Sequence, residues 1–172
     1  MPIVLARIDQ RFIHGQILAS AALAKRKVNG VIVADTALSG DGLRQGIFDG
    51  ALSAADPPLG GAHYVDPARL AELLRERDSK GKRFLLIFGD VGGVLQALSD
   101  GVPIESLNLG NYCTRSEDPV ELYQGFRLGP SEIRELDEIA GRVSRIYFGP
   151  LDESRKAYTP RPGPRPPRPE SQ

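Results

Sequence analysis

The segment from Arg11 to Gln16 carries the side chains best suited to chemistry. It reads Arg-Phe-Ile-His-Gly-Gln and follows an apolar run, Ile3–Ile8, and the acidic residue Asp9. An imidazole is nucleophilic near neutral pH and becomes a good leaving group once it is protonated. Phosphoryl transfer depends mainly on positioning and charge neutralisation, so His14 beside an arginine has the groups needed to accept and release a phosphoryl group.

Neighbouring residues could complete such a site. Arg7 and Arg11 could neutralise the transferring group with forked donors. Gly15 would allow a close backbone approach or an unusual turn, and Gln16 could add an amide donor at the start of a helix. Asp9 could orient the histidine or an arginine by hydrogen bonding, or it could cap a turn, and the sequence favours neither alternative.

Apolar runs alternate with helical patterns, and several runs are apolar on both faces, as in a covered parallel sheet. The expected strands are Ile3–Ile8, Val28–Ala34, Ala62–Val65, Arg83–Phe88, Ser106–Leu109 and Val143–Phe148. The expected helices are Gln16–Lys25, Asp41–Ser53, Pro67–Arg77, Val91–Leu98 and Pro130–Ile139. This rhythm predicts an α/β fold with an open, mainly parallel sheet, helices on both faces and an active-site loop after the first strand.

The expected position of His14 favours an anion site. It lies where the first strand is followed by a helix, at the sheet edge where open α/β proteins bind ligands. The first N–H groups of that helix would face the same place and favour an anion. This interpretation requires an imidazole that solvent can reach. Asp35, Asp90 and Asn111 follow other strands and could line the same edge, although their residue types favour helix capping.

The composition excludes several classes of function. The 172 residues are enough for one domain, and 22 basic side chains balance 22 acidic ones, so attraction to nucleic acid is not expected. No apolar run is long enough to cross a bilayer, and the single cysteine is typical of a reducing compartment, so the expected location is the cytoplasm. His63 and Cys113 are too far from His14 in sequence to form a metal motif, and no cofactor is expected.

The composition changes near the end of the chain. From Tyr158 onward, prolines and arginines dominate, and such a segment cannot form a packed core. We therefore expect a folded domain over residues 1–157 and an extended or disordered tail over residues 158–172.

Residues Leu5 to Ile17 resemble the signature of the IIB component of the mannose/fructose/sorbose family of the sugar phosphotransferase system, which typically reads V-R-I-D-D-R-L-I-H-G-Q-V. Further similar segments are Val31–Asp35, Pro57–Gly60, Leu85–Phe88 and Leu107–Asn111. The resemblance spans residues 2–156, and a motif of this length is far more specific than a short glycine pattern.

The resemblance implies a phosphocarrier. His14 would accept a phosphoryl group, usually on Nδ1 in this family, from a phosphohistidine of a IIA protein. It would pass the group to a sugar held by membrane IIC and IID subunits, with which the protein would associate peripherally. Arg11 would contact the phosphoryl group, and Gly110 and Asn111 could form part of the phosphate loop. The sequence leaves the sugar and self-association open.

Two other interpretations remain. The Pro/Arg-rich tail and departures from the family motif, such as Gln10 in place of aspartate, are compatible with a regulatory module of the same fold that senses phosphorylation without transporting sugar. A nucleotide-binding α/β domain would instead need a glycine fingerprint after the first strand, where this chain has Asp9 to Arg11.

Overall fold

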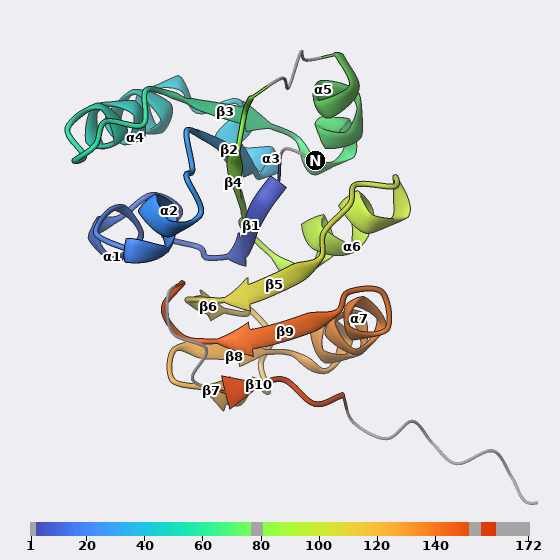
Figure 1. Cartoon of the computed structure of the whole chain (residues 1–172). Coiled ribbons are helices and arrows are strands. Elements are labelled where there is room, and N and C mark those ends of the chain that lie inside the picture. The colour runs from blue at the N-terminus through green and yellow to red at the C-terminus, as the bar shows by residue number, and fades with distance from the viewer. Residues whose placement is uncertain (1–2, 77–80, 152–155, 161–172) are drawn as a thin grey trace, which may run out of the picture.

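The computed structural model describes residues 3–76, 81–151 and 156–160, and Figure 1 shows their arrangement. The large sheet consists of β1 (Ile3–Ile8), β2 (Gly30–Ala34), β3 (Ala62–Val65), β4 (Phe84–Phe88), β5 (Ser106–Leu109), β9 (Arg145–Phe148) and β10 (Lys156–Ala157). Its strand order is β10-β9-β5-β1-β4-β2-β3. Neighbouring strands are parallel except for β10, which is antiparallel to β9. The predicted open, mainly parallel sheet is confirmed.

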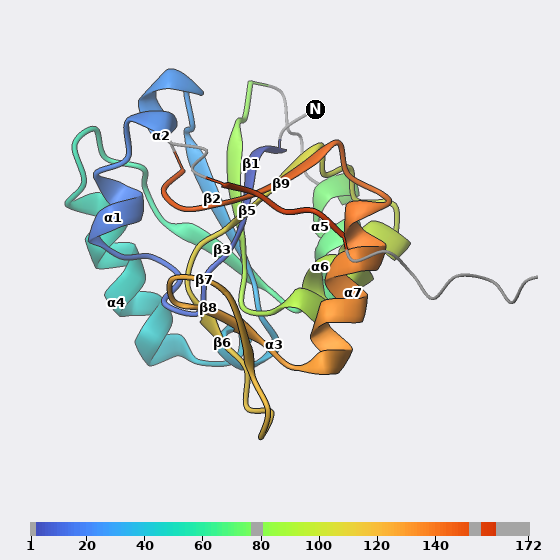
Figure 2. The same ribbon diagram turned by 90° about the horizontal axis from the view of Figure 1, so that it is seen from below.

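Helices cover both faces of this sheet (Figure 2). One face carries α1 (Gly15–Leu18), α2 (Ala21–Lys25) and α4 (Gly42–Ser53). The other carries the 3₁₀ turn η1 (Pro67–Arg69), α5 (Leu70–Glu76), α6 (Val91–Ser99) and α7 (Pro130–Ala140). The short helix α3 (Thr36–Ser39) follows β2 and lies near β3 and α4.

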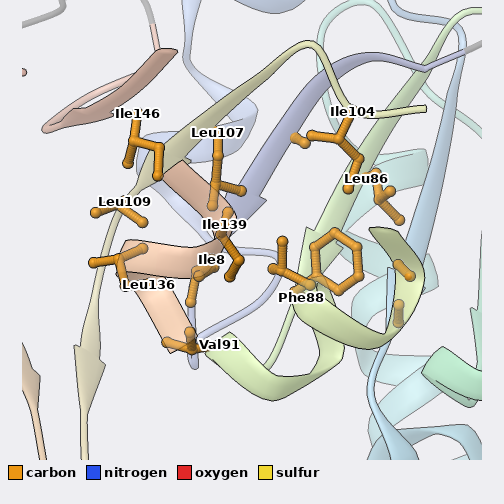
Figure 3. Packing of buried hydrophobic residues seen from close by; sticks show 14 of the residues in the cluster. Ile8, Leu86, Phe88, Val91, Ile104, Leu107, Leu109, Leu136, Ile139 and Ile146 are labelled. Atoms are coloured by element: carbon orange, nitrogen blue, oxygen red, sulfur yellow. The ribbon is translucent and has the colours of Figure 1, made fainter. Parts of the chain in front are cut away.

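Side chains alternate between two hydrophobic clusters, as a strand with both faces covered requires. In β4, Leu86 and Phe88 face the α6 and α7 side, whereas Leu85 and Ile87 face the α1 and α2 side. Figure 3 shows the first cluster, where residues of β1, β4 and β5 meet α6 and α7. This packing holds the carboxyl ends of the central strands in a defined position, which is where the candidate site lies.

The expected helix over Gln16–Lys25 is wrong, because the structure has two short helices there. α1 ends at Leu18, and Ser20 begins α2 by accepting a hydrogen bond from the Ala22 amide on its hydroxyl oxygen. Serine is a strong helix start signal, so the chain begins a new helix instead of extending the first. The expected helices Asp41–Ser53, Val91–Leu98 and Pro130–Ile139 are present with one end shifted by a single residue. The helix expected over Pro67–Arg77 begins as the 3₁₀ turn η1 and is α-helical only from Leu70, and Arg77 lies outside the described residues.

A second, small sheet was not predicted. It consists of β6 (Tyr112–Cys113), β7 (Val120–Tyr123) and β8 (Phe126–Leu128), in the order β6-β8-β7. Phe126 is fully buried, and the ring of Tyr123 stacks on Phe148 of β9 with centroids 5.2 Å apart. This sheet therefore lies against β9, and its β7–β8 turn reaches the carboxyl edge of the large sheet.

The boundary expected between residues 157 and 158 falls too early. The Tyr158 amide donates to the Ile146 carbonyl, 2.9 Å away, and its hydroxyl donates to Asp137 at 2.6 Å. Its ring also meets the edge of Phe148. An aromatic side chain held in this way belongs to the domain, and the expected tail from residue 161 onward lies outside the described residues.

The sheet order creates a switch point between β1 and β5. The chain leaves β1 toward β2 on one side, and it leaves β5 toward β9 on the other. Connections that diverge in this way open a crevice at the carboxyl ends of the two strands, and ligands of open α/β sheets bind there.

Candidate functional site

The loop between β1 and α1 is anchored by a buried aromatic ring. The Phe12 amide donates to the Asp9 carbonyl at 3.0 Å, and Phe12 itself has a left-handed backbone with φ of 52°. This conformation is uncommon for a residue with a side chain. It turns the ring into the core against Phe48, with centroids 6.1 Å apart, and the Arg44 guanidinium lies 5.6 Å from the ring centroid. The unusual turn in this loop is thus at Phe12.

A second anchor joins the loop to the segment after β5. The Gln10 amide donates to the Asn111 carbonyl at 2.8 Å. Its side chain donates to the Cys113 carbonyl at 3.1 Å and accepts from the Cys113 amide at 3.0 Å. Gln10 and Phe12 therefore fix the first half of the loop, next to Asp9.

Asp9 is the centre of the site. Its side chain is fully buried, and Oδ2 accepts hydrogen bonds from Arg7 Nε at 3.0 Å, Arg7 Nη2 at 2.8 Å and His14 Nε2 at 2.9 Å. Oδ1 accepts from the backbone amide of Arg11 at 3.0 Å. Burial alone would raise the pKa of this carboxyl, but the hydrogen bond from His14 and the charge of Arg7 outweigh burial, so the pKa is lowered below its ordinary value. Asp9 is therefore an ionised carboxylate.

The carboxylate determines which ring nitrogen of His14 carries a proton. An ionised carboxylate can only accept hydrogen bonds, so Nε2 of His14 must be the donor. In the neutral ring, Nδ1 is then left with a lone pair. The side chain is 16% exposed, so solvent reaches part of the ring, as the sequence interpretation required. This arrangement would leave Nδ1 as the ring nitrogen that can accept a bond.

The two arginines of the motif have different environments. Arg7 is buried, and its guanidinium makes two bonds to Asp9 through Nε and Nη2 and two through Nη1, to the Asn108 side chain and the Gly149 carbonyl. Arg11 is half exposed and bonds to Gln16 Oε1 at 3.2 Å, with its Nε 3.6 Å from Asp9. Arg11 therefore has N–H groups directed outward, whereas four of the five N–H groups of Arg7 are already used.

A pocket of about 320 Å³ opens beside these arginines. It brings together five residues expected at the site, Arg7, Arg11, Gln16, Gly110 and Asn111, with further residues from the β7–β8 turn and from the segment that follows β9. Gly110 is needed by the fold, because a Cβ there would lie 2.3 Å from the Arg7 guanidinium carbon.

Of the two roles expected for Gly15, the structure excludes the unusual turn and leaves the close backbone approach open. Its backbone is not left-handed, and a Cβ at this position would have no heavy atom within 4 Å. The fold therefore does not require glycine here, and the position lies open beside the histidine. Because α1 has only four residues, the helix contributes little dipole, and the expected anion site at its start reduces to the first backbone amides.

Asp35 and Asp90 line another pocket, together with Gln10 and Phe12 of the site loop, and His14 is not part of its lining. Asp35 accepts from the Leu38 amide at 2.7 Å, and Asp90 accepts from the Gly93 amide at 2.6 Å. Both residues cap helices, which is the role that their types favoured. His63 lies in β3, near the far edge of the sheet, with its ring against Phe84.

Sequence reasoning missed Asn108 and Gly149 as site residues. Asn108 is a fully buried polar residue between two buried leucines of β5, and that pattern is a signal that could have identified it. Gly149 contributes only its backbone carbonyl oxygen, and a pattern of side chains in the sequence cannot indicate such a contact. Tyr123 and Gln124 also line the pocket, and they come from the small sheet that was not predicted.

The fold and the site together define an α/β protein with a partly exposed histidine at the switch point of a parallel sheet, paired with a buried carboxylate. The profile of the family described as "PTS system sorbose subfamily IIB component" matches residues 3–148. The chain belongs to this family of the sugar phosphotransferase system.

The proteins with similar sequences are named for different sugars. The mannose-specific EIIAB component of Escherichia coli K12 is 33% identical over 115 residues, which cover 67% of this chain and 34% of that protein. The chain thus matches about one third of the length of these relatives. The sorbose-specific EIIB component of Klebsiella pneumoniae is 28% identical over 149 residues, 83% of this chain and 85% of the relative.

Solved structures agree with the fold. The IIBSor domain of the sorbose permease from Klebsiella pneumoniae has a TM-score of 0.78 at 22% identity and covers 92% of this chain and 93% of that one. The N-acetylgalactosamine-specific IIB component 1 from Escherichia coli has a TM-score of 0.79 at 19% identity, with 92% and 99% covered. In the described part of the chain, the helices are all too short or too polar to cross a membrane.

Proposed function

We propose that the protein is a phosphocarrier in which Nδ1 of His14 accepts a phosphoryl group from a phosphohistidine of a IIA protein and passes it to a sugar held by IIC and IID subunits. The observation that carries the proposal is the hydrogen bond from His14 Nε2 to the buried, ionised Asp9. This bond leaves Nδ1 free, and the surrounding residues fit a transferring phosphoryl group.

In the first step, the lone pair of His14 Nδ1 attacks phosphorus. The new bond joins Nδ1 to phosphorus, while the bond between phosphorus and the donor imidazole breaks. The donor ring, protonated on its other nitrogen, leaves as a neutral imidazole. His14 becomes a phosphorylated imidazolium, and its positive charge lies 2.9 Å from the Asp9 carboxylate. Asp9 therefore stabilises the phosphorylated form as well as selecting the nucleophile.

The transferring group needs neutralisation and room. Arg11 would contact the phosphoryl oxygens with its outward N–H groups, and the first amides of α1, at Gly15 and Gln16, would add donors. The open space beside Gly15 leaves the approach unobstructed. Asn111 and the one N–H of Arg7 not bonded within the protein line the adjoining pocket, where they could meet the phosphoryl group or its acceptor.

In the second step, a sugar hydroxyl attacks the same phosphorus atom. The Nδ1–phosphorus bond breaks, the hydroxyl proton goes to solvent, and His14 returns to its neutral form with the proton still on Nε2. The site can thus both accept the phosphoryl group and release it without a cofactor, because imidazole is both nucleophile and leaving group.

The test uses a phosphorylated IIA donor and the only two histidines of the chain. We expect His14→Ala to abolish labelling and His63→Gln to retain it, with an acid-labile label as phosphohistidine chemistry requires. Both variants should still unfold in a cooperative transition, which would show that they are folded. Undiminished labelling of the His14 variant would reject the carrier assignment. Label acceptance without sugar phosphate formation in the presence of IIC and IID subunits would favour the regulatory alternative.

A further inference from the structure

Asn108 is a fully buried polar residue at the centre of the large sheet. It lies in β5, level with Arg7 of β1 on one side and Tyr147 of β9 on the other. Its Nδ2 donates to the Gly149 carbonyl at 3.1 Å and is 3.4 Å from the Tyr147 carbonyl. A buried amide without partners costs about 1–3 kcal/mol, so these bonds define one orientation of the side chain.

The oriented amide holds one end of Arg7. Asn108 Oδ1 accepts a hydrogen bond from Nη1 of Arg7, and the Gly149 carbonyl accepts a second from the same nitrogen at 3.0 Å. The opposite edge of the guanidinium bonds to Asp9, and its flat face lies against Gly110. Arg7 therefore cannot rotate without breaking buried hydrogen bonds.

We propose that Asn108 is a positioning residue, which acts on His14 through Arg7 and Asp9. The inference rests on the phosphocarrier function proposed above. By fixing Arg7, Asn108 fixes the carboxylate, so that Oδ2 faces Nε2 of the histidine ring. Nδ1 is then the nitrogen presented to phosphorus, although Asn108 itself touches no reacting atom.

The amide group suits this role better than its closest replacement. An aspartate at position 108 would have the same size but no N–H for the Gly149 carbonyl. It would also place a second carboxylate beside Arg7, so that two anions would compete for one guanidinium. Asp9 would be held less firmly, and the imidazole could turn and donate from Nδ1 instead. The nucleophilic nitrogen would then be hidden in part of the population.

The test determines which ring nitrogen of His14 carries the proton. It uses nitrogen NMR of the unphosphorylated, uniformly ¹⁵N-labelled protein at a pH where the histidines are neutral. Only His14 and His63 contribute imidazole signals, and His63 serves as the internal reference. We expect the wild type to show His14 with its proton on Nε2, and Asn108→Asp to show a mixture of tautomers. Phosphoryl transfer from a IIA donor should slow by about 10–100-fold, the effect typical of removing a residue that orients a ligating or reacting group.

Leu107→Ala is the matched control, because Leu107 is the neighbouring buried residue of β5 and faces the hydrophobic cluster (Figure 3). It should lose stability but keep the wild-type tautomer and a transfer rate within twofold. If Asn108→Asp fails to fold, Asn108→Ser makes the same comparison with a smaller polar group.

Three results would contradict either the role proposed for Asn108 or the phosphocarrier function on which it rests. A wild-type His14 that carries its proton on Nδ1 would overturn the role of Asn108. So would an Asn108 variant with the wild-type tautomer and rate. If the wild type accepts no phosphoryl group, the phosphocarrier function fails, and the proposed role of Asn108 in transfer fails with it. The tautomer comparison would then still show separately whether Asn108 fixes the ring.

Discussion

Replacing Gly110 with alanine should destabilise the protein, because Arg7 occupies the space that a side chain would need. The added Cβ would lie 2.3 Å from both the Cζ and Nη2 atoms of Arg7. Real contacts of this kind are longer than 3 Å, so either the backbone after β5 shifts or Arg7 leaves its place. Gly110 has no left-handed backbone, so strain in φ does not contribute.

The two responses differ in cost. Overpacking that shifts the backbone costs about 1–3 kcal/mol, whereas moving Arg7 would leave Asp9 buried without its cation, at about 3–5 kcal/mol. The protein will adopt the less costly response, so we expect a loss of about 1–3 kcal/mol in the free energy of unfolding. For a domain of this size that corresponds to a fall in Tm of about 2–12 °C.

The assay is urea denaturation with thermal unfolding, and Gly15→Ala is the matched control. It makes the same chemical change in the same site, but a Cβ there meets no atom within 4 Å, so its stability should stay at or above the wild-type value. Equal midpoints for the two alanine variants would refute the reasoning, since they would mean that Arg7 is free to move aside.

Two further predictions concern the charged groups around the histidine. The pKa of folded Asp9 lies below its ordinary value of 3.8, so this carboxylate contributes stability above that value and loses it as the pH falls through the folded pKa. The stability difference between wild type and Asp9→Asn, from urea midpoints, should therefore shrink between about pH 5 and pH 3; a constant difference would contradict the assignment. Arg11→Lys should slow single-turnover transfer by about tenfold because the forked donor is lost, whereas Arg127→Lys, at a similarly exposed ion pair, should leave it unchanged. Equal rates for the two lysine variants would remove Arg11 from the proposed mechanism.

Much of the large sheet could be predicted because its central strands β1, β2, β4 and β5 are mostly buried. The bounds of β1, β3 and β5 match the expected ranges, since a short apolar run between turn residues has few other solutions. The small sheet escaped prediction because Val120–Tyr123 alternates weakly and Tyr112–Cys113 is only two residues long. Such strands form through contacts with Phe148, which lies far along the chain.

In the candidate site too, some residues could be found from the local sequence and others could not. The motif points to His14, Asp9 and Arg11 as candidates, because the residue types suited to the chemistry lie within six consecutive positions. It does not reveal that Arg7 faces inward, since the residue that holds it, Asn108, comes 101 positions later. Local patterns therefore locate the reacting groups, whereas the network that orients them depends on strand order.

The bond between Arg7 and the Gly149 carbonyl joins positions 142 residues apart. During synthesis on the ribosome, the first strand emerges early, and Arg7 can pair with Asp9 but still lacks its later partners, Asn108 and the Gly149 carbonyl. Only after the β9 segment has emerged and inserted beside β5 can those groups be enclosed. The arrangement of Arg7 and Asp9 beside His14 should therefore be completed only late in synthesis, after β9 has taken its place in the sheet.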